Sequence, residues 1–313
     1  MILPRPATTR VWAVSSLAGL LVASTACGEY VAYENGPPAN VPPGAVNLDE
    51  ATKAWLESTK TLEHVAWTGL LTRYAKLDSN GVVLLDYRAI STSTEATLQL
   101  DRYLATLDVV ESAQLEGTAE RLGYWINGYN AAVVRGVLDF WSGDSTYSVS
   151  SNDFVFFDLP RHRFGGLVLS LNQIEHGVLR GDTTHASVRG TSDDLRARLL
   201  ALHQEVWQGQ PIDARFHIAL NCASLSCPNL LFEAFRGPAL ETQLDSASRA
   251  FVADPEKGAG PNGISSIFRF YAADFEVTYG NAAGFISRHR EGGLDGVNLD
   301  RYLEYDWSLN APP

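Results

Sequence analysis

Only two cysteines follow the N-terminal segment of this chain, Cys222 and Cys227, and they lie five positions apart. The third, Cys27, ends a segment that has the features of an export signal. An exported chain of 313 residues with one close cysteine pair has no disulfide framework, so an apolar core must hold its fold together. The pair is either one local bridge or a reactive thiol with a neighbour, and this choice decides whether the chain is an enzyme.

Residues 1–26 are predicted to be a signal peptide. Two arginines give a positive start, residues 11–23 form an apolar run too short to span a bilayer stably, and small residues precede Cys27. This pattern is typical of bacterial lipoprotein processing, although Ser24 stands where leucine is usual. We therefore expect Cys27 to carry a lipid that anchors the protein in the cell envelope, at its periplasmic or outer-membrane face. The alternative is an ordinary cleaved signal and a soluble secreted or periplasmic protein.

Residues 27–45 are rich in Pro, Gly and Asn and lack apolar periodicity, which predicts a flexible linker between the lipid anchor and the folded body. From residue 46 to residue 310 there is no second linker, repeat or low-complexity block. This stretch is therefore expected to form one domain.

The charge of the chain restricts its partners. Two of the 24 Lys and Arg side chains lie in residues 1–26 and all 36 Asp and Glu side chains follow them, so the chain after the predicted signal has a formal charge of −14. Such a surface repels phosphate backbones and anionic lipid. We expect no nucleic-acid partner, and membrane contact only through the N-terminal lipid anchor.

Apolar periodicity predicts an α+β fold, in which N-terminal helices pack on a small, mostly antiparallel sheet. The clearest pattern is the wide apolar stripe of residues 118–141. Further helices are expected over 48–77, 98–110, 172–180, 193–207 and 239–252. A hairpin is expected from 154–159 and 164–169, and buried strands over 214–221 and 264–271.

Four motifs stand out along the chain: YWINGYN at 124–130, IEHGVLR at 174–180, HIALNCASLSCP at 217–228 and YDWSLN at 305–310. In order and rough spacing they resemble those of the family called Domain of Unknown Function 547. The resemblance is densest over residues 120–252, with 271–275 as a further anchor. It implies a fold like that of cysteine peptidases or transglutaminases, with a Glu-His-Cys constellation.

Cys222 is the predicted nucleophile of such a site. It is expected to end the buried strand and enter a serine-rich turn, which would project the thiol from a rigid element. Cys227 is the second choice, because Pro228 after it is a favoured first helical residue and a helix N-terminus lowers a thiol pKa. The alternative for both is a Cys222–Cys227 disulfide that staples the turn.

His176 is the predicted base, with Glu175 as the carboxylate that orients its imidazole. One sulfur is then expected within hydrogen-bond reach of His176. Adjacent helical residues point about 100° apart, so a direct contact between the two does not follow from the sequence. The alternative is an ion pair between Glu175 and Arg180 on the helix surface.

Three asparagines and a second histidine are predicted to support the site. On an extended strand His217 shares a face with Asn221 while Cys222 points the other way, which favours a structural role for this histidine. Asn127 and Asn130 share one face of an apolar helix. They are expected to orient the catalytic turn, supply an oxyanion donor or anchor a loop.

Neither a metal nor a cofactor is expected. A zinc site from Cys222, Cys227 and His176 is the weaker alternative, because its cysteines are spaced more widely than a usual ligand pair. No phosphate-binding or dinucleotide motif is present. The remaining histidines match no zinc spacing: His64, His162, His185, His203 and His289.

We therefore expect a cysteine-dependent hydrolase or acyltransferase that acts on an amide or thioester bond of a small peptide-like or acyl substrate in the cell envelope. The alternative is a catalytically silent envelope lipoprotein, a binding or scaffolding module in which Cys222 and Cys227 form a structural disulfide. The C-terminal segment 305–310 carries two large aromatics and is expected to pack as an extended arm, with Trp307 buried.

Overall fold

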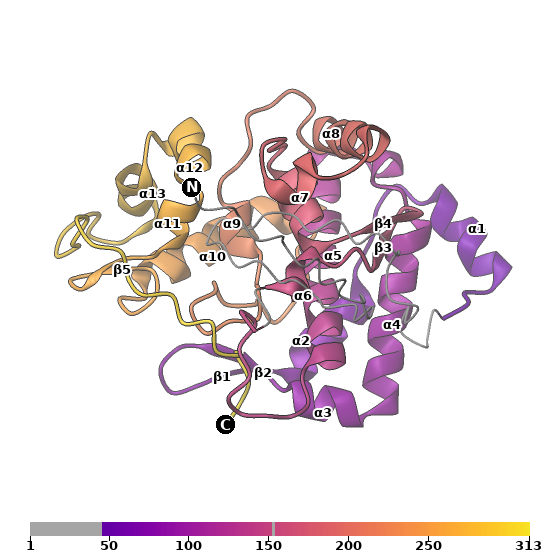
Figure 1. The fold of residues 1–313 in the computed structure, drawn as a ribbon, viewed down its shortest axis with the longest axis horizontal. Helices are drawn as coiled ribbons and strands as arrows, with labels where there is room; N and C mark the ends of the chain where they lie inside the picture. Colours follow the sequence, from indigo (N-terminus) through magenta and orange to yellow (C-terminus); the bar gives the residue numbers. More distant parts are fainter. Residues whose placement is uncertain (1–45, 152–153) are drawn as a thin grey trace, which may run out of the picture.

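The computed structural model describes residues 46–151 and 154–313. Helices make up most of it, together with small antiparallel sheets, as the α+β prediction requires (Figure 1). The predicted single sheet is wrong, because the described strands form three separate two-stranded hairpins. The predicted signal, the linker and Cys27 lie outside the described residues. No helix within the described ranges is long and apolar enough to cross a membrane.

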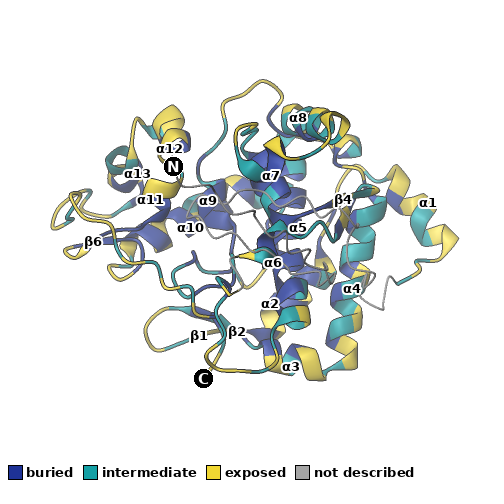
Figure 2. Ribbon diagram, in the orientation of Figure 1, coloured by how far each residue is buried: buried dark blue, intermediate teal, exposed yellow. Residues whose placement is uncertain are grey.

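The central element is α5 (Gly117–Phe140), which matches the helix predicted over 118–141. Its residues are mostly buried, because helices pack on several of its sides (Figure 2). Gly136 permits one close approach, since a Cβ there would overlap the ring of Phe156. The helices that contact it include α3 (Tyr87–Thr92), α4 (Thr94–Val109), α8 (Asp193–Trp207) and α10 (Leu240–Ala253).

The N-terminal segment forms two helices instead of the single one predicted over 48–77. These are α1 (Glu50–Ser58) and α2 (Val65–Tyr74). His64 separates them with a left-handed φ of 53°, which interrupts a helix. The chain then extends into β1 (Ala75–Leu77), which pairs with β2 (Val83–Leu85).

The predicted hairpin is displaced along the chain. Its strands are β3 (His162–Phe164) and β4 (Leu167–Leu169), joined by Gly165 and Gly166, whose positive φ values suit a two-residue turn. The first predicted strand, 154–159, contains the short helix α6 (Val155–Asp158). After the hairpin follow the π-helical turn η2 (Gln173–Leu179) and α7 (Ala186–Arg189).

Two predicted strands are wrong. Residues 214–221 contain α9 (Phe216–Ala219), and 264–271 contain α11 (Ile267–Phe270). Residues 216–221 are all buried, and the run over 264–271 is buried only up to residue 268. Runs this short carry no period that separates a strand from a helix. The remaining elements are η1 (Ser112–Gln114), η3 (Gly237–Ala239), β5 (Ala259–Gly260), β6 (Gly263–Ile264), α12 (Ala272–Tyr279) and α13 (Ala282–His289).

The C-terminal segment is an extended arm, as predicted. It runs from the region of α11–α13 across the molecule to β1 and β2 (Figure 1). Ser308 bridges Ser148 and Leu309 bridges Ser224, while Asn310 is only 1% exposed. The prediction that Trp307 is buried is wrong, because its ring is only partly covered.

Buried histidines should make the stability of the fold depend on pH. Burial lowers the pKa of His64 and of His162 to about 3 each. Below about pH 6.5 these two histidines bind protons in the unfolded chain but not in the folded chain. Each histidine should therefore lower the free energy of unfolding by about 1.4 kcal/mol for every unit that the pH falls between 6.5 and 3.

His162→Leu isolates this effect, because the Nε2 atom of His162 has no hydrogen-bond partner among the described residues. Urea unfolding between pH 6.5 and 4.5 should show a shallower loss of stability for the variant, by about 1.4 kcal/mol per unit. Parallel slopes for variant and wild type would contradict the assignment.

Candidate active site

A cavity of about 160 Å³ lies where η2, the loop after α9, α11 and the C-terminal arm meet. It brings together Glu175, His217, Cys222 and Cys227, which all line it. His176 is not among the described residues that line it. The other lining residues are mainly aromatic and aliphatic: Tyr129, Phe154, Phe157, Asn172, Leu220, Pro228, Ile267, Phe270, Tyr271, Tyr305 and Trp307.

Cys222 and Cys227 form a disulfide at the cavity wall, with their Cα atoms 6.1 Å apart. The hydroxyl of Tyr305 lies 3.3 Å from the sulfur of Cys227 and 3.5 Å from that of Cys222. Cys222 is partly exposed, whereas Cys227 is only 4% exposed. The predicted helix N-cap at Cys227 is wrong, because the residues after it form a loop up to residue 236.

The loop that carries Cys222 is held by buried amides. Asn130 on α5 donates from Nδ2 to the carbonyl of Ala219 (2.9 Å) and accepts from the N–H of Asn221 (2.8 Å). The amide oxygen of Asn221 accepts from the N–H of Ala223, and its Nδ2 donates to the carbonyl of Pro228. Asn130 and Asn221 therefore anchor the loop that carries Cys222.

Ala223, directly after Cys222, has a left-handed φ of 64° and is completely buried. Non-glycine residues in this conformation concentrate at functional turns. Asn127 lies farther away and anchors another loop, since its side chain bonds both the N–H and the carbonyl of Phe235. Of the three roles weighed for Asn127, loop anchoring is therefore the one found.

Glu175 reaches the cavity from the π-helical turn η2, a type of turn that is frequent at functional sites. Its carboxylate accepts hydrogen bonds from the hydroxyls of Tyr129 (3.0 Å) and Tyr271. Neither the predicted contact with His176 nor the alternative ion pair with Arg180 is among its hydrogen bonds and ion pairs. The two tyrosine hydroxyls bond the Glu175 carboxylate, while the guanidinium of Arg180 is used by other partners.

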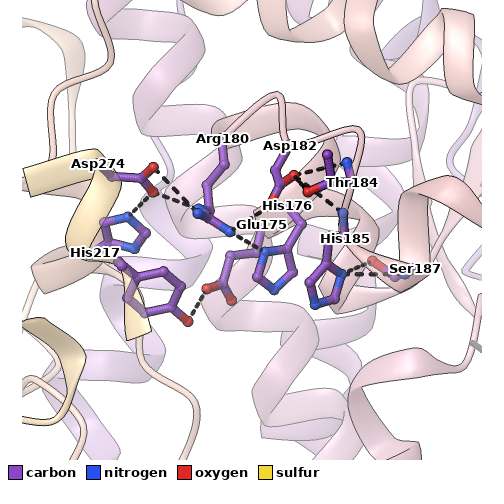
Figure 3. Close-up of polar contacts among 10 residues, drawn as sticks. Glu175, His176, Arg180, Asp182, Thr184, His185, Ser187, His217 and Asp274 are labelled. Carbon is purple, nitrogen blue, oxygen red and sulfur yellow. Dashed lines mark hydrogen bonds and ion pairs between the residues drawn. The ribbon is translucent and has the colours of Figure 1, made fainter. Parts of the chain in front are cut away.

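Arg180 contacts His176 directly and is connected to His217 through Asp274 (Figure 3). Its guanidinium donates to Asp274 (Nε to Oδ2, 2.5 Å), to Asp182 (3.2 Å) and to Nδ1 of His176 (2.7 Å). Burial lowers the pKa of Arg180, but the hydrogen bonds and charge of Asp274 outweigh it and raise the pKa.

His217 forms the His–carboxylate pair of the site. Its Nε2 lies 2.8 Å from Oδ2 of Asp274 (Figure 3). Its ring stacks on Tyr271 with centroids 3.9 Å apart. Burial lowers the pKa of the imidazole, although Asp274 opposes this shift. Burial also raises the pKa of Asp274, but the hydrogen bonds from His217 and Arg180 prevail and lower it. His217 is therefore neutral and Asp274 charged near pH 7.

The structural role of His217 was predicted from the alternation of side chains along a strand. That premise is wrong, because the residues around His217 form the helix α9. Asp274 was not predicted at all. It lies 57 residues after His217, and its only sequence signal was its place in the family-like segment 271–275.

His176, the predicted base, is buried in the network behind the cavity. Its ring stacks on His185 with centroids 3.5 Å apart, and Nδ1 contacts Arg180. Burial, with the charges of His185 and Arg180, lowers its pKa well below the usual value. No group of three or more His, Cys, Asp or Glu within the described ranges is placed to hold a metal ion.

Residues 112–252 match the model of a family described as Protein of unknown function, DUF547. The match supports the family resemblance over the segment that contains the motifs at 124–130, 174–180 and 217–228. No curated protein and no solved structure matches the chain. The family match supplies no activity, so the function has to be argued from the site itself.

Proposed function

We propose that the reduced protein is a cysteine-dependent hydrolase or acyltransferase of the cell envelope that acts on an amide or thioester bond, with a site like that of cysteine peptidases or transglutaminases. The observation that carries the proposal is that Cys222 and His217 line one cavity while Asp274 bonds Nε2 of the same imidazole. This is the nucleophile, base and orienting carboxylate that thiol catalysis requires.

The chemistry begins with the disulfide. A dithiol reductant cleaves the Cys222–Cys227 bond, which gives two protein thiols and the oxidised reductant. Because Nε2–H of His217 donates to Asp274, Nδ1 is free to accept the Cys222 proton. The sulfur then bonds to the acyl carbon, the bond to the leaving amine or thiol breaks, and His217–H⁺ protonates that group. Water or an acceptor amine finally takes the acyl group from sulfur.

Tyr305 is the candidate oxyanion donor, because its hydroxyl lies within 3.5 Å of both sulfurs. Burial raises the pKa of this phenol, so it keeps the proton that it would donate. We assign the nucleophile to Cys222 because its side chain is partly exposed and Cys227 is buried.

The second candidate function is a binding module, and the closed disulfide favours it. Thiol alkylation separates the two. After reduction by a dithiol and desalting, iodoacetamide at pH 6.5 should alkylate Cys222 rapidly and Cys227 slowly, as mapped by peptide mass spectrometry. His217→Ala should slow Cys222 by up to about 100-fold, because a thiol of pKa near 8.5 is only about 1% thiolate at that pH.

His176→Gln is the control for His217→Ala, because it also replaces a buried histidine but lies outside the cavity lining. It should leave the alkylation rate of Cys222 within a few-fold of wild type. A Cys222 thiol that reacts no faster than a model peptide thiol, and does not respond to His217→Ala, would reject the enzyme and favour the binding module.

A further inference from the structure

Aromatic rings form a continuous wall of the cavity. Trp307 is at its centre, 4.8 Å from the ring of Phe154 and 4.3 Å from that of Tyr305. Tyr305 in turn lies 5.7 Å from Phe270. The wall is therefore built from the C-terminal arm and from two other segments, and it covers the disulfide side of the cavity.

Two rings of this wall are exposed at the mouth of the cavity. Phe154 is 36% exposed and Phe270 is 44% exposed. Phe154 also has a left-handed φ of 62°, a conformation that a bulky residue adopts only at an energetic cost. Neither exposure nor strain stabilises the free protein, and both are understandable if these rings contact a ligand at the mouth of the cavity.

The cavity offers negative charge and no positive side chain. Among the described residues that line it, Glu175 is the only carboxylate and none is Lys or Arg. The guanidinium of Arg180 lies behind the lining, over the ring of Tyr271, and donates to Asp274, Asp182 and His176. His217, the one titratable nitrogen group in the lining, is neutral because burial lowers its pKa.

We propose that this cavity binds the ammonium group of a small organic cation. An ammonium group is attracted to the faces of aromatic rings and to a carboxylate, and both surround this space. An anionic ligand would meet the Glu175 carboxylate with no Lys or Arg in the described lining to bind it. A cavity of about 160 Å³ accommodates a head group and not a large ligand.

This proposal narrows the substrate class of the proposed function and rests on that function: either the acyl donor or the acceptor carries an ammonium group. Binding itself needs no thiol. It is therefore tested on the full chain with the disulfide closed, so that a failure here leaves the thiol chemistry untouched, and a failure of the thiol chemistry leaves this result standing.

The test titrates choline, and separately its neutral isostere 3,3-dimethylbutan-1-ol, while the fluorescence of the protein and the heat of binding are recorded. Choline should bind with saturation, and the isostere about 10-fold or more weakly, since only the cation gains from the rings and the carboxylate. Equal binding of the two probes, or no binding of choline, would overturn the proposal.

Variants locate the site. Glu175→Gln and Phe270→Leu should each weaken choline binding by about 10-fold. Phe270 is exposed, so its variant keeps the core intact if Glu175→Gln fails to fold. Glu276→Gln, which removes an exposed carboxylate of α12 outside the cavity, should leave the affinity unchanged. Unaltered binding by folded Glu175→Gln and Phe270→Leu would also refute the assignment.

Discussion

Replacing His217 with alanine should lower kcat/KM of the reduced protein by about 10²- to 10⁴-fold, the usual contribution of a general base. The loss follows from the geometry, because His217 is the imidazole that lines the cavity with Cys222. Asp274→Asn should cause a loss of the same order, since it removes the acceptor that fixes the His217 tautomer. Hydrolysis of a panel of fluorogenic acyl amides by reduced, desalted protein measures both effects.

The matched control is His176→Gln, which can still accept a hydrogen bond from Arg180 and lies outside the cavity lining. Its kcat/KM should stay within a few-fold of wild type. The double variant His217→Ala/Asp274→Asn should be no worse than either single variant, because members of one catalytic unit are non-additive. Loss of turnover in His176→Gln together with retention in His217→Ala would restore His176 as the base.

Long periodic segments were predictable from the sequence. The stripe over 118–141 is α5, and the helices expected over 193–207 and 239–252 are α8 and α10 within one residue at each end. Each of these helices is three or more turns long, so many residues follow the same helical period. Asn130 was identifiable because an amide on such a face must find a partner.

The arrangement of the site was less predictable. The segment around His217 is a short buried run, so its helical turn could not be distinguished from a strand. On a strand the imidazole of His217 would point away from Cys222, and the pair was therefore not predicted. The π-helical turn in η2 shifts Glu175 and His176 out of ordinary helical register. Asp274 reaches His217 only through the packing of α12 against α9, a long-range contact that no local pattern encodes.

Replacing Arg180 with leucine should lower the free energy of unfolding by about 3–5 kcal/mol, the usual cost of removing one partner from a buried ion pair. The side chains of Arg180 and Asp274 are each only 11% exposed. Without the guanidinium, Asp274 and Asp182 keep their charge in a poorly solvated site, and His176 loses its partner. Urea unfolding at pH 7 measures the change.

A surface ion pair supplies the matched control for Arg180→Leu. Arg249 pairs with Asp245 at 2.6 Å, but its side chain is 63% exposed, so Arg249→Leu should change stability by no more than about 0.5 kcal/mol.

The deficit of Arg180→Leu should also shrink as the pH falls from 7 to 4. In wild type the pKa of Asp274 is lowered, so the stability that this carboxyl contributes is kept down to about pH 4 and is lost only below it. In the variant, burial without the guanidinium raises the pKa of the carboxyl, and uptake of a proton above pH 4 relieves the unpaired charge. A deficit of less than about 1 kcal/mol at pH 7, or one that grows towards pH 4, would show that the Arg180 network does not hold the site together.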